Sequence, residues 1–144
     1  MDKQRLYDFV AQKTNKCRIL VVGDVMLDKY YYGEVTRISP EAPVPITHVT
    51  SSKETLGGAA NVAHNLALLG CETFIAGFVG DDYHCQSLLD KFTACGIDYK
   101  GLIHTERPTT TKLRVMGGHQ QMLRLDFEEA APIDGPYAER LQNY

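Results

Sequence analysis

Three polar side chains and two glycines in the first half of the chain have the types and spacing to bind a ligand. Asp24 and Asp28 stand four residues apart, and Gly57, Gly58 and Asn61 open a stretch rich in small residues. Glycine lets a ligand approach the backbone, and the N–H groups at a helix N-terminus are free to donate to it. Asn61 can add a side-chain amide. We interpret this as a ligand-binding turn, and the alternative is a Gly-Gly turn that only leads into a tightly packed helix.

A buried strand is expected to position the two carboxylates. Residues 18–22 form an apolar run rich in Val and Ile that ends at Gly23, which is typical of a parallel strand covered on both faces. Ligands of open α/β sheets bind just outside the carboxyl ends of such strands, where Asp24 and Asp28 follow. Within the helix that Gly57 opens, His64 is interpreted as a packed or surface residue.

Three cations lie on a predicted β-hairpin between residues 109 and 127. Lys112 and Arg114 share one face of the first arm by the period of two, and Arg124 lies on the second arm. A solvated strand face would explain any one of them alone. Three together favour an anionic partner.

The other predicted elements alternate between strands and helices. They are a helix over 2–16, short antiparallel strands over 29–32 and 46–51 outside the main sheet, a strand over 72–78, a helix ending at Cys95 before Gly96, a strand over 100–104 and a helix from Pro136. The hairpin strands are expected over 109–116 and 120–127, on either side of Gly117-Gly118. The last helix reaches Tyr144 after about two turns, which predicts that the chain stops within a longer domain.

Composition restricts the class of protein. With 144 residues, 44% of them hydrophobic, the chain is expected to form at most one domain, 1–144. A net charge of −3 argues against a nucleic-acid partner or a polybasic membrane anchor. The sequence has neither a long apolar run nor an apolar leader, and we therefore predict a cytoplasmic location without membrane contact. The four cysteines have no C-x-x-C spacing and are expected to stay free.

The motifs together resemble the ribokinase-like (PfkB) carbohydrate kinase family over about residues 17–128. The matching segments are Val21–Asp28, Gly33–Pro45, Gly57–Ala63, Gly80–Asp82, Lys112–Arg114, Gln120-Gln121 and Arg124–Phe127. Within the family, the Arg37–Pro45 run is most similar to the enzymes that phosphorylate D-glycero-β-D-manno-heptose 7-phosphate.

The resemblance implies the N-terminal part of a doubly wound α/β sheet with a small β lid formed by strands at about 29–51. It implies transfer of phosphate from ATP with Mg²⁺ to the anomeric hydroxyl, in the synthesis of ADP-heptose for lipopolysaccharide core. This chain would supply the sugar-binding half, through Asp28, Gly57, Gly58 and Asn61. Further candidates are Asp24 for the sugar and Arg37, Lys112 and Arg114 for the 7-phosphate.

The resemblance places the general base and the nucleotide-binding residues beyond Tyr144, so no residue here is expected to be the catalytic base. It also implies a homodimer formed through the lid and, in bifunctional forms, a C-terminal nucleotidyltransferase domain. Two kinds of alternative stay open: another sugar kinase of the same family, and a non-catalytic sugar-binding fragment or an unrelated dinucleotide-binding domain. The Arg37–Pro45 run argues against the first.

Overall fold

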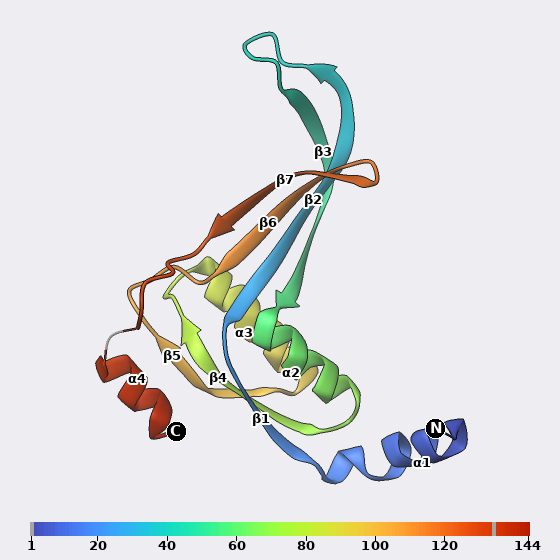
Figure 1. The fold of residues 1–144 in the computed structure, drawn as a ribbon, viewed down its shortest axis with the longest axis vertical. Coiled ribbons are helices and arrows are strands. Elements are labelled where there is room, and N and C mark those ends of the chain that lie inside the picture. Colours follow the sequence, from blue (N-terminus) through green and yellow to red (C-terminus); the bar gives the residue numbers. More distant parts are fainter. Residues whose placement is uncertain (1, 134) are drawn as a thin grey trace.

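The structure is a computed structural model that describes residues 2–133 and 135–144, and it contains two β-sheets with helices beside them (Figure 1). In chain order the elements are α1 (Lys3–Gln12), the 3₁₀ helix η1 (Thr14–Lys16), β1 (Arg18–Val22), β2 (Val25–Ile38), β3 (Pro45–Gly57), α2 (Gly58–Leu68), β4 (Glu72–Val79), α3 (Tyr83–Cys95), β5 (Asp98–His104), β6 (Thr111–Gly117), β7 (Gln120–Phe127) and α4 (Gly135–Gln142). The predicted α/β class is confirmed.

The core sheet has three parallel strands in the order β1-β4-β5, and the parallel pairing of the apolar runs at β1 and β4 is as predicted. The prediction that β1 is buried on both faces is wrong, because β1 is the edge strand of this sheet and Leu20 and Val22 are about half exposed. Against it pack α2 and α3, which also contact each other. The buried cluster includes two apolar residues of β2, Val25 and Leu27, and one of β3, Leu56, so the second sheet is anchored in the same core. Its members are Val25, Leu27, Leu56, Ala60, Ala63, Ile75, Val79, Cys85, Leu88, Phe92 and Ile97.

Local sequence explains how closely α2 packs and where α3 begins and ends. Ala60 and Ala63 of α2 are fully buried, and their small side chains let the helix lie close to the core. Asp82 caps the N-terminus of α3 by accepting a hydrogen bond from the Cys85 N–H at 2.9 Å. Gly96 ends α3 with a left-handed φ of 68°, as the sequence predicts.

The second sheet, here called the lid, has four strands in the order β3-β2-β6-β7, and it extends away from the core sheet (Figure 1). Its first two strands are longer than the predicted 29–32 and 46–51, since β2 spans 14 residues and β3 spans 13. The predicted hairpin is present as β6 and β7, but it is part of the lid because β6 pairs in parallel with β2. A parallel pairing between distant segments leaves no local sequence signal.

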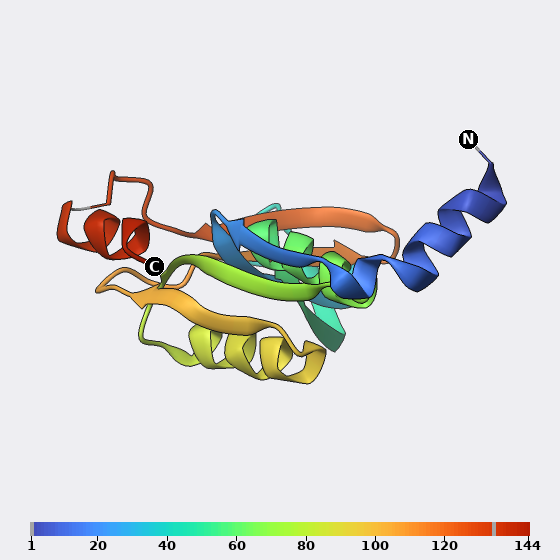
Figure 2. The ribbon, with the colours of Figure 1, turned by 90° about the horizontal axis from the view of Figure 1, so that it is seen from below.

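The ends of the chain differ in how they pack. The predicted first helix is confirmed as α1 and η1, but Leu6 and Phe9 stay about half exposed and α1 projects from the rest of the molecule (Figure 2). The predicted C-terminal helix is confirmed as α4, which contacts β5. All four cysteines are free, in agreement with the prediction.

Candidate functional site

The two glycines lie at the junction where β3 passes into α2, and both are closely packed. The position that a Cβ would take on Gly57 is 2.8 Å from Asp28 Oδ2, and on Gly58 it is 2.5 Å from the Asp24 carbonyl oxygen. Gly58 also has a left-handed φ of 52°. The Ala59 N–H donates to that same Asp24 oxygen at 2.9 Å. Glycine is therefore required here for close packing of β2 against the start of α2.

Asp28 lies within β2, whereas the sequence places it just past the end of the first strand. Its Oδ1 accepts a hydrogen bond from Arg114 Nη1 of β6 at 2.6 Å, and both side chains are about four-fifths buried. The guanidinium also lies over the ring of Tyr30, 5.2 Å from its centroid, and Tyr30 stacks on Tyr32. A charge-assisted bond and a cation–π contact thus fix Arg114 beside Asp28.

Asp28 and Asn61 line the same groove, here called the lid-base groove, which has a volume of about 620 Å³. Asp28 enters it from the lid and Asn61 from the exposed side of α2. Other residues that line it are Tyr30, Glu54, Thr55, His64, Asn65 and Lys91. The fold therefore brings together the lid carboxylate and the helix amide that the sequence singled out, with Gly57 in contact with the first. A carboxylate and an amide on opposite sides of a groove suit a ligand with several hydroxyl groups.

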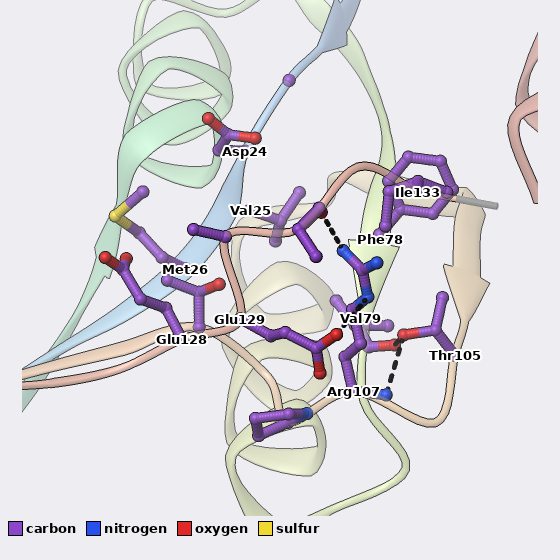
Figure 3. Close-up of a pocket in the computed structure, with 15 residues that line it drawn as sticks. Asp24, Val25, Met26, Phe78, Val79, Thr105, Arg107, Glu128, Glu129 and Ile133 are labelled. Carbon is purple, nitrogen blue, oxygen red and sulfur yellow. Dashed lines mark hydrogen bonds and ion pairs between the residues drawn. The ribbon is translucent and has the colours of Figure 1, made fainter.

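Asp24 lines a different cavity, of about 370 Å³, and is exposed (Figure 3). Met26, Phe78 and Glu128 also line this cavity, which lies beside the carboxyl ends of β1 and β4. Met26 packs against Gly57 and Gly58, so the two hollows lie on either side of the same junction. Asp24 and Asp28 therefore do not form a pair.

The predicted cations are mostly neutralised by neighbouring carboxylates within the lid. Lys112 contacts Glu128 at 3.1 Å and Asp126 at 3.3 Å, and its hydrogen bond to Glu128 raises the pKa of the ammonium group. Arg124 makes two hydrogen bonds to Asp126. Arg37 lies apart from all of these, exposed and nine residues along β2 from Asp28. At about 3.3 Å per strand residue this separation is about 30 Å.

Two polar contacts beside the second cavity were not singled out from the sequence. Arg107 donates to the carbonyl oxygens of Ala131 and Pro132 at 2.6 and 2.5 Å and so holds the segment after β7 against the core. It also pairs with Glu129 (Figure 3). Asp82 accepts from the Thr109 N–H at 2.8 Å in addition to capping α3. Burial would raise the pKa of Asp82, but these backbone hydrogen bonds outweigh burial and lower it. The Gly80–Asp82 turn is a sequence signal for the Asp82 contact. No sequence pattern indicates the contacts of Arg107.

The fit of a metal ion and of a nucleotide can be tested on the residues present. Across residues 2–133 and 135–144, no three His, Cys, Asp or Glu side chains gather in a way that could hold a metal ion. We therefore assign no Mg²⁺ site to these described residues. Lys112 and Arg124 pair with Asp126, and Arg114 pairs with Asp28, so a phosphate group at any of these cations would compete with a carboxylate. In the same described part, no helix is long and apolar enough to span a membrane.

Solved structures with the same fold include sugar kinases and ribokinases. A sugar kinase from Clostridium perfringens superposes with a TM-score of 0.69 at 16% identity, over 88% of this chain and 40% of that one. Arabidopsis thaliana ribokinase in complex with ribose and ATP superposes with a TM-score of 0.61 at 20% identity, over 76% and 35%. The fold is therefore the ribokinase-like α/β fold, as predicted.

Sequence comparison gives the family. The pfkB family carbohydrate kinase profile matches residues 16–140, and the chain belongs to that family. The bifunctional protein HldE of Methylobacillus flagellatus is 56% identical over 117 residues, which are 80% of this chain and 24% of HldE. The D-beta-D-heptose 7-phosphate kinase of Bordetella bronchiseptica is 48% identical over 130 residues, 88% of this chain and 42% of that kinase. The chain thus spans 24% of the length of the first relative and 42% of the length of the second.

Proposed function

We propose that this chain is the sugar-binding half of an ATP-dependent kinase that phosphorylates D-glycero-β-D-manno-heptose 7-phosphate on its anomeric hydroxyl. The observation that carries the proposal is the lid-base groove, where Asp28 and Asn61 face a shared space in a chain about half identical to a heptose 7-phosphate kinase. The reaction belongs to the synthesis of ADP-heptose for lipopolysaccharide, in the cytoplasm.

In this proposal the chain positions the sugar, which is the main contribution that a protein makes to phosphoryl transfer. The Asp28 carboxylate has acceptor sites beyond the one that Arg114 occupies, and these accept hydrogen bonds from sugar hydroxyls. Asn61 binds a further hydroxyl from the opposite side of the groove, and Asp24 is the weaker sugar candidate because it lines the other cavity.

Arg114 is the strongest candidate for the 7-phosphate because it is fixed beside Asp28. Lys112 is a weaker one, since binding would displace two carboxylates. Arg37 lies too far along β2 to reach the groove of its own chain. The proton-accepting base and the groups that bind ATP belong to the rest of the kinase.

A substrate panel tests this function. The complete protein with Mg-ATP is expected to convert heptose 7-phosphate to a 1,7-bisphosphate, seen as a new anomeric phosphate signal by phosphorus NMR. Its kcat/KM for this sugar should exceed that for ribose or fructose 6-phosphate by at least about 100-fold, because a site that hydrogen-bonds particular hydroxyls rejects sugars that lack them. The 144-residue chain alone should give no bisphosphate. Equal or better turnover of ribose would refute the heptose assignment.

We also propose that two copies associate through their lids. The lid face opposite Asp28 carries exposed apolar side chains on β7, with Leu123, Leu125 and Phe127 about half exposed. Of the three consecutive tyrosines, only Tyr31 lies on this face, since side chains alternate along β2. The complete protein is expected to sediment as a dimer at micromolar concentration, and Leu125→Asp to shift it toward monomer. A strict monomer before mutation would contradict this arrangement.

A further inference from the structure

A polar cluster at the base of the lid joins it to α3, and one member of the cluster, Glu54, also lines the lid-base groove. Lys29 and Glu54 are directly opposite each other in the antiparallel pair β2–β3, and their charged groups are 2.8 Å apart. The second oxygen of Glu54 accepts a hydrogen bond from the Ser87 hydroxyl of α3 at 2.6 Å. The Lys29 ammonium also lies 5.9 Å from the centroid of the Tyr83 ring, at the start of α3.

The contacts of this cluster are more sheltered than those of a surface ion pair. The side chains of Lys29 and Glu54 are 15% and 20% exposed, against 71% and 56% for the pair formed by Arg18 and Glu72. Burial alone would raise the pKa of Glu54, but hydrogen bonds from Lys29 and Ser87 outweigh it and lower the pKa. The hydrogen bond to Glu54 raises the pKa of Lys29. Both groups are therefore held in their charged forms.

The bond between Ser87 and Glu54 has a distinct place in the fold. Among the side-chain hydrogen bonds of the described residues, it is the one that links a lid strand to a core helix. It lies two residues farther out along β2 and β3 than Leu27 and Leu56, which sit in the core. Lys29 immediately follows Asp28 in β2, so a shift of β2 relative to the core also moves the Asp28 carboxylate.

We propose that Lys29, Glu54 and Ser87 are positioning residues that hold the lid at a fixed distance from the core and so set the separation of Asp28 and Asn61 across the lid-base groove. The proposal rests on the proposed function, because that separation matters only if a sugar bridges the two side chains. These contacts would affect the sugar-binding step and not phosphoryl transfer itself, because they reduce the conformational freedom of the lid that sugar binding would otherwise have to remove.

Ser87→Ala in the complete protein is the sharpest test because it removes the link to α3 and leaves the lid pair of Lys29 and Glu54 intact. We expect the KM for heptose 7-phosphate to rise at least about threefold, with the KM for ATP unchanged. Hydrogen–deuterium exchange should become faster in peptides covering 25–32 and 51–57 and stay unchanged in β4. Ser87→Thr keeps a hydroxyl and is expected to restore both readouts.

Ser52→Ala is the matched control, since Ser52 is exposed on β3 and makes no side-chain hydrogen bond within the described residues. If Ser87→Ala gives the same sugar KM and the same lid exchange as this control, the positioning role is wrong. Faster exchange throughout the core would also overturn it, because it would show general destabilisation. If the unmutated protein does not phosphorylate heptose 7-phosphate, the proposed function fails, and the exchange comparison by itself decides whether the tie holds the lid.

Discussion

Asp28→Asn in the complete kinase is expected to lower kcat/KM for the sugar phosphate at least about tenfold, while the KM for ATP stays unchanged. A hydrogen bond to a charged group contributes about 1.5–3 kcal/mol, and each ~1.4 kcal/mol corresponds to a factor of ten. The substitution also removes the negative charge that fixes the Arg114 guanidinium, whose Nη1 lies 2.6 Å from Oδ1. Loss of that partner adds to the effect because it frees the best candidate for the phosphate contact.

Steady-state kinetics with each substrate varied in turn measure this effect. Asp98→Asn is a suitable control because Asp98, at the start of β5, pairs with Lys100 and lies outside the lid. Wild-type sugar kinetics in Asp28→Asn, with an unchanged circular dichroism spectrum, would show that neither the Asp28 charge nor its contact with Arg114 contributes to sugar binding.

Gly58→Ala is expected to destabilise the protein by about 2–5 kcal/mol, clearly more than Gly96→Ala. Both glycines have a left-handed φ, of 52° and 68°, and an alanine there costs about 1–2 kcal/mol. A Cβ at Gly58 would meet the Asp24 carbonyl oxygen at 2.5 Å, whereas one at Gly96 would meet nothing within 4 Å. The collision adds about 1–3 kcal/mol of overpacking.

The free energy of unfolding in urea measures both variants under the same conditions. Equal destabilisation would mean that β2 and the start of α2 separate easily, and the close packing at Gly58 would then have no energetic weight. If Gly58→Ala lowers the free energy of unfolding more than Gly96→Ala does, we also expect it to weaken sugar binding. The reason is that Asp28 lies against Gly57, the neighbour of Gly58.

The sequence predicts best those features that depend on local patterns. Helix α3, with Asp82 before it and Gly96 after it, follows from capping rules, and β4 follows from its apolar run. The hairpin of β6 and β7 follows from Gly117 and Gly118. By contrast, the pairing of β6 with β2 joins segments far apart in the chain, and no residue pattern announces it.

The same limit applies to the candidate site. Residue type and spacing singled out Asp28, Gly57 and Asn61, and the fold brings them to one junction. Spacing could not show that Asp24, only four residues from Asp28, faces another cavity, because the chain bends before β2 begins. Nor could it show that Arg114 is already bound to Asp28, since that contact depends on strand register.

The construction of the lid from two separate segments has a consequence for how the protein folds. Asp28 and Arg114 are 86 residues apart in the chain, with β3, α2, β4, α3 and β5 between them. Closing so long a loop costs entropy that is recovered only when the parallel pairing of β2 and β6 forms, and such non-local pairings form slowly. During synthesis, β2 and β3 leave the ribosome long before β6 exists. We therefore expect the ion pair between Asp28 and Arg114 to be among the last contacts made during folding.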